Sequence, residues 1–247
     1  MVFAFTLGGA LIANWARTAL PEHHLGEESR DTVKLAIGLI ATMTALVLGL
    51  VTASAKSSFD AMDLAVKHTA VDVLTLDRLL ARYGPETGQI RGALRNAVAG
   101  RIDAILREAA SGLTDVDPMR SGTATGSESL ADAIQLLTPH DDSQQSLKSR
   151  ARDLAEEILQ VRWLVFAGVG SSVPGPFITI LVFWLTITFA SFGLFAPRNG
   201  TVVMALFVCA VSVGSAVFLI LELDGPFDGF IRVSVEPLRY AHANMNQ

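Results

Sequence analysis

The stretch Val33–Ala55 has the sequence VKLAIGLIATMTALVLGLVTASA, and its only charge is Lys34, at the second position. A helix needs about 20 mostly apolar residues to cross the ~30 Å hydrocarbon core of a bilayer, because lipid leaves the backbone to satisfy its own hydrogen bonds. Val33–Ala55 meets both requirements. The segment therefore predicts a membrane-spanning helix, and the rest of the chain is arranged around it.

Three further segments predict spans. Thr201–Leu221 and Phe177–Ala196 are uncharged, and the second follows a Pro-Gly-Pro breaker. Val2–Leu20 carries Asn14, Trp15 and Arg17 in its last turns, so it spans only if these side chains lie at the interface, where Trp anchors and Arg extends to water. A secretory signal begins with a positive region, whereas Arg17 follows the apolar run, so we expect a retained helix. The sequence thus predicts four spans.

Composition supports the membrane class and excludes others. Apolar residues make up 51% of the 247 residues, charged residues only 17%, and the mean hydropathy is +0.43. These values depart from globular averages. The charges gather in the middle of the chain, where 13 Lys and Arg between 56 and 162 stand beside 16 acids between 60 and 157. This mixed surface is not polybasic, so we expect no nucleic-acid partner. Cys209 is the only cysteine, which excludes an intrachain disulfide.

The segment between the second and third spans predicts a bundle of helices. Its apolar residues repeat at spacings of three and four, which is typical of packed or coiled helices. The first seam ends at Gly84-Pro85 and comprises Phe59, Met62, Val66, Thr69, Val73, Leu76, Leu80 and Tyr83. A second helix, from about 86 to 110, has the seam Ile90, Leu94, Val98, Ile102 and Ile105. After a loop at 111–127 and a short helix near 128–137, Asp141 or Asp142 caps a long helix with the seam Leu147, Ala151, Leu154, Ile158, Val161 and Val165.

We therefore expect an all-α integral membrane protein with a helical, partly coiled extramembrane insert. Its sections are 1–55, the first two spans and their polar loop; 56–173, the insert; 174–223, the last two spans; and 224–247, a C-terminal tail. The helices of the insert should continue from those of the membrane. Four spans place both termini and the insert on one side. Lys and Arg near the span ends favour the cytoplasm by five to four, and we expect a cytoplasmic insert and C-terminus.

One side of the second span collects small and hydroxyl-bearing residues with an ammonium at each end. At 100° per residue, Ile40, Met43, Val47, Leu50 and Val51 lie opposite. Small residues allow close helix packing in lipid, which is the commoner reason for such a pattern. The same residues could instead line a pore, leaving room for water while the two lysines attract anions. We define this small-residue stripe as Lys34, Gly38, Thr42, Ala45, Gly49, Thr52 and Lys56.

The loop after the first span concentrates imidazoles and carboxylates. In a helix, His23 and Glu27, and likewise His24 and Glu28, would lie four residues apart and could share a divalent cation or sense pH. Gly26 interrupts the segment, and the two-histidine spacing of a zinc protease is missing. The favoured interpretation is an acidic N-terminal cap, including Asp31, for a span that opens near Thr32. We predict no resident cofactor, with a divalent cation or another inorganic ion as the alternative.

The exit of the last span carries the acids Glu222, Asp224 and Asp228 around Gly225-Pro226. A water-exposed turn is the favoured interpretation, and a cation-attracting vestibule is the alternative. The sequence has no nucleophile elbow, phosphate-binding loop, metal-protease pair or nucleotide fingerprint. We therefore expect no enzymatic activity.

The chain resembles the bacterial bestrophin-like domain family over nearly its whole length. The segments that carry this resemblance are 20–25 (LPEHHL), 46–50 (LVLGL), 54–60 (SAKSSFD), 76–80 (LDRLL), 83–86 (YGPE), 192–199 (FGLFAPRN) and 222–227 (ELDGPF). The resemblance implies four spans, both termini in the cytosol, a homo-oligomeric ring of five subunits, and an ion pathway lined by the second span. The aromatic and isoleucine-rich neck of true bestrophins is replaced here by Gly, Ala and Thr.

Two functional hypotheses follow. The first is an oligomeric, bestrophin-like ion channel or pore of the bacterial inner membrane, with the small-residue stripe facing the pathway. The second is a non-conducting membrane scaffold or sensor whose helical insert binds a ligand or a partner protein. In both, the chain contacts membrane lipid and associates with further copies of itself.

Overall fold

The computed structural model of the protein describes residues 4, 8, 9, 12, 27–111, 130–168, 175–195, 199–225 and 229–245, and most of these residues are helical. These residues include no β-strand, and residues 229–235 form bends and irregular chain before the last helix. They fall into two compact units. One comprises Met1–Ser57 with Ser172–Asp224, and the other comprises Ser58–Ser171 with Gly225–Gln247.

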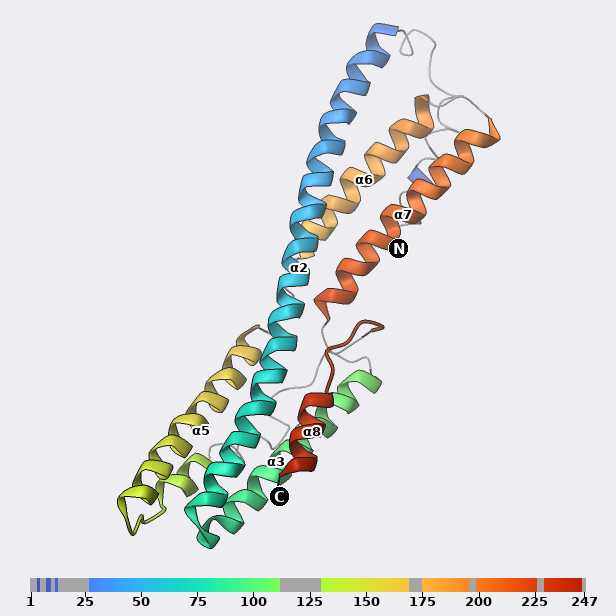
Figure 1. Ribbon diagram of the computed structural model, residues 1–247. Coiled ribbons are helices and arrows are strands. Elements are labelled where there is room, and N and C mark those ends of the chain that lie inside the picture. Colours follow the sequence, from blue (N-terminus) through green and yellow to red (C-terminus); the bar gives the residue numbers. More distant parts are fainter. Residues whose placement is uncertain are drawn as a thin grey trace. The chain divides into compact units, whose positions relative to one another are not determined.

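Helix α2 (Glu27–Tyr83) is the longest element, with 57 residues in one unbroken helix (Figure 1). At 1.5 Å per residue it extends about 85 Å, far more than one bilayer crossing needs. The expectation that a membrane helix continues into the insert is therefore confirmed. The helix also begins at Glu27, five residues earlier than the predicted opening near Thr32.

Three helices of the described chain are long and apolar enough to cross a membrane: α2, α6 (Gly175–Phe195) and α7 (Gly200–Asp224). The structure thus supports three of the four predicted spans. The fourth, at 2–20, lies outside the described residues except for positions 4, 8, 9 and 12. Asn199 caps α7 because its Oδ1 accepts a hydrogen bond from the Val202 amide at 3.0 Å.

The first unit packs α2, α6 and α7 together. A buried cluster joins Leu181 and Leu185 of α6 to Val217 of α7, with Val47 and Leu48 of α2 packed against it. A second cluster pairs Phe189 of α6 with Ala210 of α7. The buried Thr44 and Thr188 hydroxyls donate to carbonyl oxygens one turn earlier, so neither is left unsatisfied in an apolar setting.

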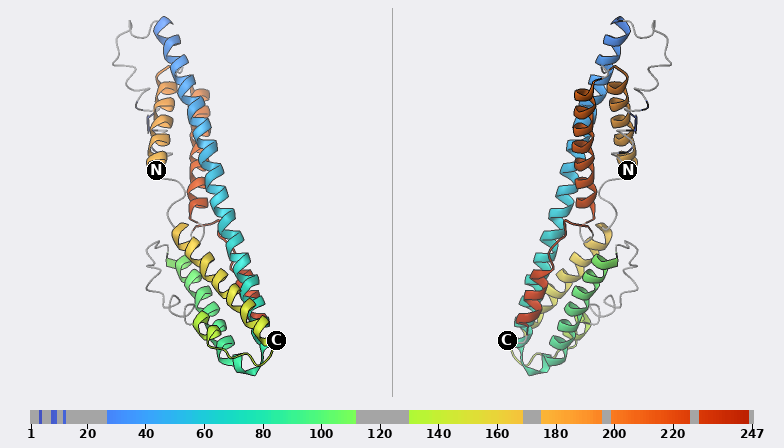
Figure 2. Two further views of the ribbon diagram at one scale, coloured as in Figure 1. Left: turned by 90° about the vertical axis from the view of Figure 1, so that its left-hand side faces the viewer. Right: turned by 90° about the vertical axis from the view of Figure 1, so that its right-hand side faces the viewer.

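The second unit has its own core. It is built by the C-terminal half of α2, α3 (Gly88–Ser111), a helical turn at 130–135, α5 (Asp142–Gly168) and α8 (Glu236–Asn244). Figure 2 shows α3 and α5 alongside this half of α2. Every position of the predicted α3 seam is buried, as are Val66, Val73, Leu76, Leu80 and Tyr83 of the α2 seam. Of the α5 seam, Ala151 is buried, and Leu154 and Ile158 pack against the same core. Helix α8, which the sequence analysis did not predict, adds Leu238 and Ala241 to this core.

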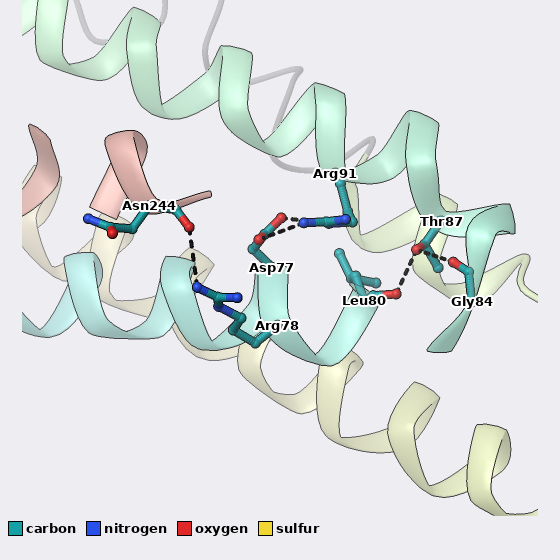
Figure 3. Close-up of polar contacts among 7 residues, drawn as sticks. All are labelled: Asp77, Arg78, Leu80, Gly84, Thr87, Arg91 and Asn244. Atoms are coloured by element: carbon teal, nitrogen blue, oxygen red, sulfur yellow. Dashed lines mark hydrogen bonds and ion pairs between the residues drawn. The ribbon is translucent and has the colours of Figure 1, made fainter. Parts of the chain in front are cut away.

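Polar contacts at the α2–α3 turn fix how the two helices meet (Figure 3). Asp77 is fully buried and forms a two-pronged ion pair with Arg91, at 2.8 Å and 2.9 Å. The Thr87 hydroxyl lies 2.6 Å from the Leu80 carbonyl oxygen, in the 3-10 turn Pro85–Thr87. Gly84 adopts a φ of +144°, a conformation that disfavours side chains. The chain therefore reverses where the Gly-Pro pair predicted that α2 ends.

Candidate functional site

The small-residue stripe lies on a side of α2 that the described chain leaves uncovered. Thr52 is half-buried, and the other six positions are exposed, in agreement with an outward-facing surface. The side of α2 that packs within the unit is instead formed by Ile37, Thr44, Val51 and Ala55. At 100° per residue, the centres of these two sides lie roughly a third of a turn apart.

A third side of α2 carries large apolar residues that are also exposed. Leu46 and Leu35 expose 75% and 77% of their surface, so nothing described covers them. Helical periodicity predicted one bulky face opposite the small residues. The structure divides that face, because Val51 is buried while Met43 and Leu50 are exposed. We define the outer apolar side as Leu35, Leu39, Met43, Leu46 and Leu50.

The two glycines of the stripe make no close packing contact within the described chain. A Cβ atom added at Gly38 or at Gly49 would have no neighbour within 4 Å. Glycine stabilises helix pairs in lipid by letting two backbones approach. Neither glycine serves that purpose against a described helix.

The threonines of the stripe direct their hydroxyl protons into the helix. Thr42 donates to the Leu39 carbonyl oxygen at 2.8 Å, and Thr52 donates to that of Leu48 at 2.7 Å. A hydroxyl whose proton is used in this way offers its oxygen lone pairs outward. The stripe thus presents small surfaces and hydrogen-bond acceptors between its two lysines.

Both lysines at the ends of the stripe are exposed and take part in polar or electrostatic contacts. Lys34 Nζ lies 3.0 Å from Asp31 Oδ1, and both side chains are exposed. A solvent-exposed pair of this kind is weak. It nevertheless places a carboxylate beside the ammonium at the N-terminal end. Lys56, at the other end, is exposed and also takes part in a polar or electrostatic contact.

The predicted metal or pH-sensing group is not assembled by the described residues. His23 and His24 lie outside them, and only the backbones of Glu27 and Glu28 are described, in the first turn of α2. Asp31 pairs with Lys34. Within the described ranges, no group of three or more His, Cys, Asp or Glu side chains could hold a metal ion. Acids in the first turn agree with the favoured interpretation, because carboxylates stabilise a helix N-terminus.

The boundary acids lie at the other end of a span. Glu222 and Asp224 fall in the last turn of α7, where both are half-buried and take part in polar or electrostatic contacts. Asp228 is outside the described residues.

Two ionisable groups of the insert were not singled out by sequence reasoning. The pKa of Arg91 is raised, chiefly by its hydrogen bond with Asp77. The pKa of Asp72 is raised from 3.8, mainly by burial and then by Glu157, while His68 lowers it. The sequence did contain a signal for these groups, because Asp72 and Asp77 lie inside or beside the apolar seam of α2. Periodicity alone, however, does not show which residue of another helix contacts such an acid.

Long apolar helices, an uncovered small-residue surface and a separate helical insert together define a helical membrane protein. The Bestrophin-like domain family matches residues 4–238, and the chain belongs to this family. No curated protein matches significantly.

Solved structures share the fold. Two are bacterial bestrophin homologues from Klebsiella pneumoniae, one with threonine in place of a leucine and one with threonine in place of an isoleucine. Both are 16% identical to this chain, with TM-scores of 0.68 and 0.65. A third, a single-residue variant described as a membrane protein, is 15% identical and has a TM-score of 0.69. Each match covers 99% of this chain and 96% of the other.

Proposed function

We propose that this protein is an oligomeric ion channel or pore of the bacterial inner membrane, in which the small-residue stripe of α2 lines the pathway. One observation carries the proposal: six of the seven stripe positions are exposed, and a Cβ atom added at either glycine would meet nothing within 4 Å. A water-filled axis between copies accommodates such a surface, because small side chains and hydroxyl oxygens leave room for hydrated ions. Membership of the bestrophin-like family supports the same function.

The proposed assembly follows from the family resemblance. Five copies form a ring around the pathway, each with four spans that include 2–20, and the insert and both termini lie in the cytoplasm. The outer apolar side of α2 then faces lipid or a neighbouring copy. Because the stripe is made of Gly, Ala and Thr, selectivity depends more on the lysine ends and hydroxyl oxygens than on a bulky apolar constriction.

Cysteine accessibility tests the pathway. With Cys209 replaced by alanine, single cysteines at Thr42, Ala45 and Gly49 should react with small water-soluble thiol reagents in membranes. Cysteines at Leu46 and Leu50 are the matched controls, since both side chains are exposed in the single chain but lie on the outer apolar side. Unreactive cysteines at all three stripe positions would remove the basis of the proposal.

Conduction separates the channel from the scaffold or sensor. Purified protein in planar bilayers should produce reproducible unitary currents, and modification of Gly49→Cys should alter them. The alternative draws on the separate core of the insert, which could bind a ligand or partner protein. Silent bilayers combined with saturable binding of a ligand to the insert would favour that alternative.

A further inference from the structure

Burial alternates along the non-helical residues between α7 and α8. Ile231 and Val235 are half-buried, and Val233 is 5% exposed within the core of the second unit. Arg232 and Ser234 occupy exposed positions between them. Phe230, just before Ile231, is also exposed but is apolar.

Phe230 is 90% exposed, the highest exposed fraction among the large apolar side chains of the described residues. A turn holds it in this position. Gly229 has a φ of +81°, which glycine adopts at little cost, and Arg232 Nε donates to the Gly229 carbonyl oxygen at 2.5 Å. Val233, the residue after Arg232, packs in the core of the second unit. The aromatic ring is therefore presented by a constrained turn.

The position of Phe230 along the chain indicates what covers the ring. It follows Asp224, the last residue of the candidate span α7, by six residues, which reach at most about 20 Å when fully extended. Aromatic side chains concentrate where a span meets the polar layer of the bilayer, and a nearby Arg is attracted to anionic headgroups. Single exposed apolar residues are common on protein surfaces. Phe230 differs from Leu136, which is 82% exposed, because no span lies close to Leu136 in sequence.

We propose that the turn Gly229–Arg232 is a lipid-surface anchor: the Phe230 ring enters the interfacial layer of the bilayer, and Arg232 lies at the level of the lipid phosphates. The anchor would tie the segment that leads into α8, and with it part of the insert core, to the membrane surface. This inference requires a membrane protein but does not require conduction.

Site-directed spin labelling tests the anchor. In full-length Cys209→Ala protein in vesicles of phosphatidylcholine and phosphatidylglycerol, a nitroxide is attached to Phe230→Cys or, as the matched control, to Leu136→Cys. Accessibility to membrane-soluble oxygen relative to a water-soluble nickel complex should be severalfold higher at 230 than at 136. Adding Arg232→Gln should lower this ratio at 230 when phosphatidylglycerol is present, and should change it less in phosphatidylcholine alone.

Two outcomes would overturn the anchor. Nickel accessibility at 230 equal to that at 136 would place the ring in water. Shielding from both oxygen and nickel would place it against protein, most simply a second copy of the chain. Neither outcome affects the cysteine accessibility of the α2 stripe, and silent planar bilayers do not affect the label at 230. The two proposals can therefore fail separately.

Discussion

At the residue scale, Tyr83 is the last residue of α2 and is buried in the core of the second unit. Its side chain is 4% exposed, and no described residue forms a hydrogen bond with its hydroxyl. Burial, and then the nearby carboxylates Glu86 and Asp141, raise its pKa above 10.0. Leaving a buried hydroxyl without a hydrogen-bond partner costs about 1–3 kcal/mol. The packed ring of Tyr83 therefore stabilises the folded state, whereas its hydroxyl oxygen destabilises it.

Replacing Tyr83 by phenylalanine should therefore leave stability unchanged or raise it by about 1 kcal/mol near neutral pH. The folded state holds the phenolic proton more tightly than the unfolded state does. The stability that this tyrosine contributes is thus complete below pH 10 and is lost as pH rises through the higher folded pKa. Tyr83→Phe should lose less stability between pH 9 and 11 than the parent, as measured by thermal unfolding in detergent.

Tyr240→Phe is the matched control for Tyr83→Phe, because it changes the other tyrosine of the chain at an exposed site. A Tyr83→Phe protein that is clearly less stable at neutral pH would show that the hydroxyl has a partner.

Element boundaries depend on individual caps, and α5 illustrates this at the next scale. The sequence offered Asp141 and Asp142 equally. In the structure Asp141 lies just before the helix, and its Oδ1 accepts the Gln144 amide hydrogen at 2.7 Å. Gln144 Oε1 in turn accepts the His140 amide hydrogen, also at 2.7 Å. Its Nε2 donates to the Tyr83 carbonyl oxygen, which joins the start of α5 to the end of α2.

Asp141→Ala should destabilise the protein by about 1 kcal/mol, because an exposed amide at the first turn of α5 loses its acceptor. Asp142→Ala is the matched control: it removes an adjacent exposed carboxylate that lies inside the helix. Differential thermal unfolding in one detergent compares the two variants. Equal effects of both substitutions would mean that the carboxylates act only through their charge at the helix N-terminus.

At the scale of the whole molecule, Gly9 is informative among the described residues of the N-terminal apolar segment. A Cβ atom added at Gly9 would lie 3.0 Å from Thr186 Cγ2 of α6, whereas one added at Gly8 would meet nothing within 4 Å. Gly9 therefore supports the proposal that 2–20 packs as a fourth membrane helix. Close approach of this kind depends on the missing side chain.

Gly9→Leu should therefore lower the thermal stability of the purified protein and reduce its yield as an assembled particle. Gly8→Leu should change both much less, because it adds the same apolar side chain one position away. Size-exclusion chromatography with melting curves in mild detergent gives both readouts. Indistinguishable variants would argue against packing of 2–20 on α6 through Gly9.

The sequence alone determined the three membrane-length helices α2, α6 and α7 and the buried seams of α2 and α3, because hydrophobic length and a spacing of three and four are local properties of each segment. Leu76 and Leu94 could be assigned to a core without knowledge of their neighbours. Only the tertiary structure decided which side of α2 is covered, that Asp77 pairs with Arg91, and that α8 completes the insert core. These features depend on contacts between residues far apart in the chain, and periodicity within one helix carries no information about its partner.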